Sequence, residues 1–431
     1  MRQRASRATS LRTVPHSPVL GSGAGSVPQP APEVGRRTAG TRSLWCMTTS
    51  PSASNFSLAS PDEVLAYIPH ALGFYPRNSV VLLIMQKAGL AATLRVDLPA
   101  GHHEPSNERI WVRQLVSLVH KVPQADAVFV AFYTEQSPEN AADWPPRHKL
   151  LQELVAALMR GGIQVRDGWH VGSERWHSYF CRSEECCPAE GFALPDLALT
   201  ETHLRMVVAG SAPEEQLWDG GGVADWPNKD AVRVQVSEML EGFSGSASRV
   251  RFIDGWARLL DADPAVAEQG MRGTDSVCGA LLASLHDKMI RDLLPYLAGR
   301  GEERALQAFR EVGGDAGIGE AAQDFSDFLL GAAGTQPDWE RMDRLWFICR
   351  DLLGVAAGQD HAALLCLLGW LEWAKGRGSS ALSLLKAALR TDPGYRLAQL
   401  LLRLLEAGEM PFWVADPDRA WHRKLDGRLS A

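Results

Sequence analysis

Apolar runs in the first half of the chain predict a sheet flanked by helices. Val80–Met85 and Ala127–Tyr133 are continuous apolar runs of strand length, and Leu90–Leu98 alternates apolar with polar positions. His148–Arg160 instead repeats apolar residues at three- and four-residue spacing, as an amphipathic helix does. Strands that alternate with helices in this way are typical of an α/β domain with a mixed, largely buried sheet. We expect this domain to span residues 56–225.

The first of these helices has a recognisable start. Ser60 stands at the N-cap position, Pro61 at the first helical position and Glu63 three residues after the cap. This is the pattern of a capping box, in which the Glu side chain binds back to the backbone of the N-cap residue. We therefore expect a short helix that begins at Pro61 and ends near Pro69.

The second half of the chain has a helical apolar pattern and no strand pattern. It predicts an all-helical domain over residues 226–410, including one long helix over residues 275–298, followed by a C-terminal tail at 411–431. Leu364–Asp392 has small residues and a following proline at the positions of the tetratricopeptide consensus, so we expect a tetratricopeptide-like helical hairpin there. Helical domains of this kind offer surfaces for an unknown protein partner.

Charge divides the chain unevenly. The net charge is -7, but residues 1–46 hold seven Arg, no Lys and one Glu, which gives +6 and leaves -13 for the remainder. Such an acidic body argues against nucleic acid binding by the folded part. No apolar run approaches the roughly 18–20 residues of a membrane helix, so we expect no membrane partner.

The first 55 residues lack a periodic apolar pattern and are rich in Arg, Ser, Thr, Pro and Gly. Such a segment cannot bury an apolar face, so we expect a disordered basic leader. Met47 lies shortly before the first well-formed element. We therefore also expect that the true start is Met47, with residues 1–46 upstream of it.

Three of the seven cysteines lie close together in Arg175–Gly191. An odd number of cysteines in a chain of this length suits a reducing cytoplasm better than a disulfide framework. If the strand that contains His177 runs on through Phe180, then His177 and Cys181 share one face. His177, Cys181, Cys186 and Cys187 are then a candidate tetrahedral set for zinc, although the side chains of adjacent cysteines diverge.

Two other interpretations of these cysteines stay open. Cys181 could form a regulatory disulfide with Cys186 or Cys187. Alternatively, the three thiols could be small apolar groups buried in the core, which is the commonest fate of free cysteines and the interpretation we favour.

A second candidate site follows from topology, because ligands in open α/β sheets bind beyond the carboxyl ends of strands. An arginine, two acidic residues and aromatic side chains could meet there around a small polar or phosphorylated ligand. The residues concerned are Arg95, Asp97, Tyr133, Glu135, Arg175 and Trp176. The alternative is an ordinary Arg–Asp ion pair at the sheet surface. The sequence contains no phosphate-binding loop and no common catalytic motif, so we predict no catalytic residue and identify no cofactor.

Several segments resemble an uncharacterised actinobacterial family catalogued as domain of unknown function 4192. They are Ile68–Val81, Leu94–Pro99, Arg175–Tyr179, Cys181, Cys186–Pro188 and Glu190–Gly191. The resemblance covers about residues 60–408. It implies a bacterial cytoplasmic protein and supplies no activity. We therefore expect an uncharacterised protein-interaction or small-ligand-binding module. The alternative is a metal-binding or thiol-redox protein or enzyme that uses the loop from Cys181 to Cys187.

Overall fold

The computed structural model describes residues 45–48, 60–87, 89–99, 105–138, 143–242, 245–312, 319–416 and 418–421. The expected disordered leader therefore lies outside the described residues, except for its segment Trp45–Thr48. These four residues form a strand that pairs with the segment Thr93–Val96. A strand this short takes its conformation from its partner rather than from its own periodicity, so the sequence pattern does not reveal it.

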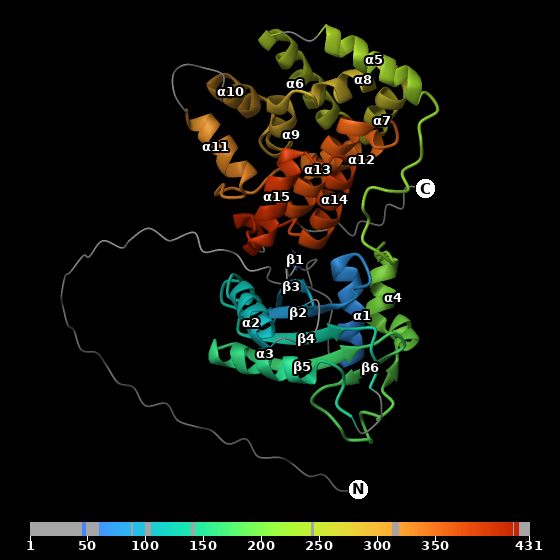
Figure 1. Cartoon of the computed structure of the whole chain (residues 1–431), viewed down its shortest axis with the longest axis vertical. Helices are drawn as coiled ribbons and strands as arrows, with labels where there is room; N and C mark the ends of the chain where they lie inside the picture. The colour runs from blue at the N-terminus through green and yellow to red at the C-terminus, as the bar shows by residue number, and fades with distance from the viewer. Residues whose placement is uncertain are drawn as a thin grey trace, which may run out of the picture. The chain divides into compact units, whose positions relative to one another are not determined.

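The first half of the chain folds as the expected α/β region (Figure 1). Its elements, in chain order, are β1 (Trp45–Thr48), α1 (Pro61–Leu72), β2 (Ser79–Gln86), β3 (Gly89–Asp97), α2 (Pro105–Val119), β4 (Ala127–Tyr133), α3 (His148–Arg160), β5 (Gln164–Val171), β6 (Arg175–Ser178), β7 (Phe192–Ala193), the 3-10 helix η1 (Leu194–Leu199) and α4 (Glu201–Val208).

The described strands form one mixed sheet in the order β1-β3-β2-β4-β5-β6-β7. Strands β2 and β3 form an antiparallel hairpin, and β4 also runs antiparallel to β2. Among the described strands, β4 and β5 are the one parallel pair, because α3 carries the chain back to the starting edge between them.

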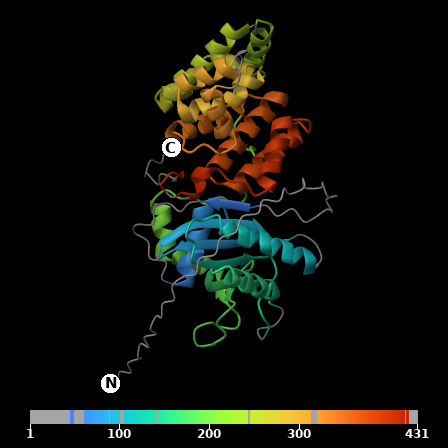
Figure 2. The same cartoon turned by 90° about the vertical axis from the view of Figure 1, so that its left-hand side faces the viewer.

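Helices cover both faces of this sheet, which explains why the run Val80–Met85 in β2 is apolar throughout. Val80, Leu82 and Ile84 pack with residues of α2 and α3, whereas Val81 and Leu83 pack with residues of α1. Successive strand residues point to opposite faces, so both sets are buried. Figure 1 shows α2 and α3 on the side of the sheet opposite to α1, and Figure 2 views the sheet from the α2 and α3 side.

The start of α1 is confirmed at Pro61, but the capping box is wrong. The Ser60 side chain makes no capping hydrogen bond. The Glu63 carboxylate instead accepts the backbone N–H groups of Glu201 (3.2 Å) and Thr202 (2.8 Å), at the start of α4. A carboxylate satisfies the first N–H groups of any helix end that reaches it, and here that helix end is far along the chain.

The second half of the chain is helical, as expected. Its elements are α5 (Lys229–Glu241), α6 (Gly245–Asp261), α7 (Pro264–Gly273), α8 (Asp275–Ser284), α9 (Lys288–Arg300), α10 (Glu302–Val312), α11 (Glu320–Leu329), α12 (Trp339–Leu352), α13 (Gly358–Ala374), α14 (Gly378–Thr391), α15 (Arg396–Glu406) and the 3-10 helix η2 (Phe412–Ala415). No helix among the described residues has both the length and the apolar character needed to cross a membrane.

Helices α13 and α14 form a helical hairpin that includes Leu364–Asp392, and they pack at short range. A β-carbon at Gly369 would lie 2.9 Å from Cγ of Leu385, so this contact requires glycine. Glu372 is buried and pairs with Arg377 at 3.1 Å between Oε2 and Nη1. This ion pair lies at the turn between the two helices.

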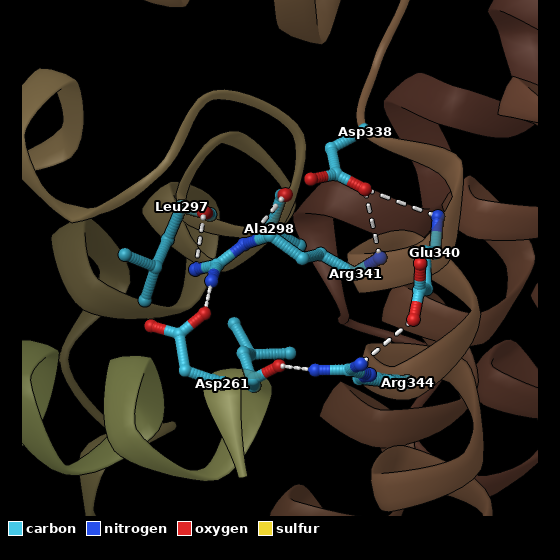
Figure 3. A network of polar contacts seen from close by, with 8 residues as sticks. Asp261, Leu297, Ala298, Asp338, Glu340, Arg341 and Arg344 are labelled. Carbon is cyan, nitrogen blue, oxygen red and sulfur yellow. Dashed lines mark hydrogen bonds and ion pairs between the residues drawn. The ribbon is translucent and has the colours of Figure 1, made fainter. Parts of the chain in front are cut away.

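Two arginines of α12 satisfy the carboxyl-terminal ends of two other helices (Figure 3). Arg341 donates to the carbonyls of Leu297 and Ala298 in α9, each at 3.3 Å, and also pairs with the Asp261 carboxylate at the end of α6. Arg344 donates to the Leu260 carbonyl at 2.7 Å. The last carbonyls of a helix lack partners within the helix, so these cations join α6, α9 and α12.

Replacing Arg341 with Met is expected to lower the free energy of unfolding by about 1–3 kcal/mol, the usual cost of leaving partly buried polar groups without their charged partner. Urea-induced unfolding followed by circular dichroism measures this change. Arg396→Met is the matched control, because Arg396 is exposed at the start of α15. Equal unfolding midpoints for the two variants would show that Arg341 contributes nothing to stability.

Part of the segment expected to be a tail lies inside the helical core. Trp413 has no exposed surface and donates from Nε1 to the carbonyl of Ala374 at 2.8 Å. Its ring lies 5.6 Å from that of Phe328, measured between centroids. Residues 422–431 lie outside the described part of the chain.

Candidate functional site

The loop that holds three cysteines connects β6 to β7 and is closed by contacts at its base. The ring of Trp176 stacks on Phe192 at 4.3 Å, and Arg175 donates to the Gly191 carbonyl at 2.7 Å. Gly191 has φ +76°, and a β-carbon there would lie 2.6 Å from the carbonyl oxygen of Trp176. Only glycine fits this position, and it lets the chain turn back into β7.

Two serines shape the loop itself. The Ser178 hydroxyl accepts the backbone N–H groups of Phe180 (3.1 Å) and Cys181 (3.0 Å), which turns the chain out of β6. The carbonyl of Ser183 accepts the N–H groups of Cys186 (3.1 Å) and Cys187 (2.7 Å). This second turn brings the adjacent cysteines back toward Cys181.

The three thiols of the loop consequently converge. The Sγ atoms of Cys181, Cys186 and Cys187 all lie within 4.8 Å of one another, and those of Cys181 and Cys186 are 3.1 Å apart. We expected the adjacent pair Cys186–Cys187 to diverge, as it would on a strand. The turn at Ser183 removes this objection, because the pair lies in a turn and not in extended backbone.

Exposure separates these thiols from the other described cysteines. Cys278, Cys349 and Cys366 are fully buried in the helical core, and burial raises the pKa of the Cys278 thiol to about 12. In the loop, by contrast, Cys186 is exposed, and Cys181 and Cys187 are half-buried. The packing interpretation that we favoured therefore fits the helical cysteines and does not fit the loop.

The hydrogen bonds among the loop thiols single out one of them. The Cys186 thiol, the Ser183 backbone and the Cys187 thiol, in decreasing order, lower the pKa of Cys181. The pKa of Cys187 is raised to about 12, first by burial and then by the neighbouring thiols. Hydrogen bonds from the neighbouring groups thus favour the thiolate form of Cys181, whereas burial disfavours that of Cys187.

His177 does not join this group. Among the described His, Cys, Asp and Glu residues, the group whose ligand atoms come within 4.8 Å of each other contains the three cysteines alone. Strand β6 ends at Ser178, so the alternation that would place His177 and Cys181 on one face stops before Cys181. Burial lowers the pKa of His177, and a hydrogen bond to the Glu190 backbone opposes that shift. Its role as a fourth ligand stays a prediction.

A pocket of about 310 Å³ opens beside the thiols. Its lining includes Asp143, His177, Cys181, Arg182, Glu184 and Cys187. Arg182 lies 4.6 Å above the ring of Trp144, and that ring stacks on His148 at 4.0 Å. Sequence reasoning missed Asp143 and Trp144, because they precede the cysteines by more than 30 residues and come beside the loop only in the folded chain.

The residues of the second candidate site take different places. Arg95 and Asp97, both on β3, form an ion pair at 2.5 Å between Nη2 and Oδ1. Arg95 also donates to the hydroxyl of Ser379 at 3.2 Å and to the carbonyl of Arg77 at 3.1 Å. Burial raises the pKa of Asp97, and the Arg95 charge opposes that shift. An Arg–Asp ion pair is therefore present, but it is not the surface pair that we considered as the alternative, because Arg95 is buried.

The other four residues lie away from this pair. The cross-strand row Asp97, Ser79, Tyr133, Val171 and Trp176 shares one face of the sheet. Neighbouring strands are about 4.8 Å apart, so Asp97 and Trp176 are separated by roughly 19 Å. Tyr133 is buried in that row, Glu135 is exposed beyond β4, and Arg175 binds the Gly191 carbonyl. The structure does not bring the six together, and ligand binding by any of them stays a prediction.

Comparison with known proteins gives one match. A family model described as a domain of unknown function (DUF4192) matches residues 61–411. The chain belongs to this family. No curated protein and no solved structure matches the chain. The DUF4192 match confirms the resemblance drawn from the sequence and includes the whole cysteine loop. It assigns no activity, so function is argued from the site.

Proposed function

We propose that this protein is a cytoplasmic small-ligand-binding protein whose ligand is a thiophilic metal ion held by Cys181, Cys186 and Cys187. Zinc is the ion that the sequence suggests. The observation that supports the proposal is the convergence of three Sγ atoms within 4.8 Å in a loop at the surface. Thiolates are the usual protein ligands of zinc and other soft ions.

The surroundings of the thiols support the same proposal. The two serine turns hold the backbone of the loop, so little conformational entropy is lost when an ion binds. Hydrogen bonds from Cys186, the Ser183 backbone and Cys187 lower the pKa of Cys181, and metal binding requires deprotonated cysteines. A reducing cytoplasm keeps such thiols free of stable disulfides.

Titration of the fully reduced chain with Zn²⁺ tests the proposal. We expect one ion per chain, and we expect binding to protect three of the seven thiols from alkylation. Peptide mapping of the alkylated protein identifies the protected cysteines. If no divalent or monovalent thiophilic ion binds at micromolar concentration, the proposal is wrong.

Disulfide chemistry is a second candidate, and the Sγ separation of 3.1 Å between Cys181 and Cys186 favours it. A disulfide requires about 2.05 Å, so a small movement of the loop closes the bond. One molecule of hydrogen peroxide would oxidise the two thiols, with loss of both thiol protons and formation of two water molecules. Non-reducing peptide mapping after mild peroxide treatment would show a Cys181–Cys186 link. Unmodified thiols would count against this candidate.

The helical region is a further proposed interaction surface. Support comes from the α13–α14 hairpin, whose close contact at Gly369 matches the small-residue spacing of tetratricopeptide units. Its likeness to that repeat and the identity of a protein partner stay predictions.

A further inference from the structure

We infer that the cysteine loop binds Cu(I) in a three-coordinate thiolate site, in preference to Zn²⁺. The inference rests on the proposed metal-binding function and specifies the ion. Zinc and monovalent copper differ in the number of ligands that each requires.

Structural zinc sites in proteins are almost always tetrahedral, with four protein ligands. The loop supplies three, and no fourth His, Cys, Asp or Glu ligand atom among the described residues falls within the same 4.8 Å group. Asp143, His177 and Glu184 line the adjacent pocket without entering that group. A zinc ion here would depend on water or an external ligand for its fourth position.

Cu(I), a soft monovalent ion, does not need a fourth ligand. Thiolates favour both Cu(I) and Zn²⁺, so ligand type alone does not separate the two ions. A d¹⁰ ion of single charge, however, is satisfied by three thiolates in a plane, whereas structural zinc takes four ligands. Copper in a reducing compartment is present as Cu(I). Three thiolates without an imidazole or a carboxylate are therefore a complete set for Cu(I) and an incomplete set for zinc.

The hairpin around the loop also differs from a segment that needs a structural ion. In zinc-dependent folds, metal binding supplies the free energy that stabilises the folded state. Here the Trp176–Phe192 stack, the Arg175–Gly191 hydrogen bond and the Ser178 turn close the base of the loop. The ion is then free to exchange, and the exposed Cys186 gives an incoming thiol access to it.

Anaerobic competition against chromogenic chelators for Cu(I) and for Zn²⁺ tests this inference on the full chain. We expect one Cu(I) per chain, an affinity on the order of 100-fold or more above that for Zn²⁺, and displacement of bound zinc by one equivalent of Cu(I). X-ray absorption at the copper edge should show three sulfur neighbours and no nitrogen.

Two variants separate a three-ligand from a four-ligand site. His177→Ala and Glu184→Gln should leave the affinities for Cu(I) and Zn²⁺ within about 2-fold of the parent, because neither residue is a ligand in the inferred site. Loss of a residue that orients a metal ligand would instead lower metal affinity by about 10–100-fold. Glu184 is exposed, so its variant keeps the test valid if His177→Ala folds poorly. Preferential zinc binding, or a loss of zinc affinity in either variant, would overturn the inference while leaving metal binding intact. Failure to bind either ion would overturn the proposed function as well.

Discussion

Trp413→Ala is expected to lower the free energy of unfolding by about 3–5 kcal/mol, which is the usual cost of truncating a fully buried aromatic side chain. Trp413 has no exposed surface, and its ring lies near those of Phe328 and Trp339. The substitution leaves a cavity among these rings and also removes the hydrogen bond to the Ala374 carbonyl. Both losses affect the core of the helical region.

The neighbouring residue provides a matched control. Phe412 is 56% exposed, and its ring centroid lies 5.7 Å from the Arg419 guanidinium. Phe412→Ala should therefore cost at most about 1 kcal/mol, the value of an exposed cation–π contact. Urea unfolding followed by far-ultraviolet circular dichroism compares the two, since tryptophan fluorescence changes when a tryptophan is removed. Similar costs for both variants would mean that residues 411–416 do not belong to the core.

The contrast between Trp413 and its prediction as part of a tail shows where sequence reasoning fails. No apolar periodicity marks residues 411–421, because the segment is short and its buried side chains, Trp413, Val414 and Ala420, do not repeat at a helical or strand spacing. Longer elements could be predicted from their apolar pattern. β2 and β4 are continuous apolar runs, and their burial on both faces follows directly from that pattern.

Partners that are distant along the chain account for most of the other differences. Glu63 stands where a capping box would place it, yet its carboxylate caps α4. The expected helix over residues 275–298 is divided into α8 and α9, because the Asp287 side chain accepts the N–H groups of Met289 and Ile290 and starts a new helix. Local pattern shows that Asp287 can cap a helix, whereas packing decides that it does.

For the candidate site, the sequence singled out the loop in which the three thiols converge but predicted a different geometry for it. Residue types and spacing were sufficient to select Cys181, Cys186 and Cys187 as a group. The extrapolation from His177 to Cys181 assumed that β6 continues, whereas the Ser178 hydroxyl ends it. A serine three residues before a cysteine is a weak signal in sequence, so the turn becomes evident only in the structure.

Replacement of any one loop cysteine by Ala should lower metal affinity by more than about 100-fold, beyond the range seen when only second-shell partners of a metal ligand are changed. In the proposed site each of Cys181, Cys186 and Cys187 supplies one ligand atom of three, so the loss of any one should weaken binding. Competition with a chelator, applied to each variant with the same ion as the parent protein, measures the loss.

Cys278→Ala is the matched control, because it also removes one thiol but removes it from the buried core of the helical region. It should keep the parental metal affinity while losing some stability, since a buried side chain is shortened. The loop variants should instead lose metal affinity and keep their stability. Their metal-free unfolding energies should stay within about 0.5 kcal/mol of the parent, as surface substitutions usually do. If the metal-free Cys181→Ala protein were unfolded, the thiols would be holding the loop together without any ion. If all three variants kept the parental metal affinity, the ion would bind elsewhere in the protein.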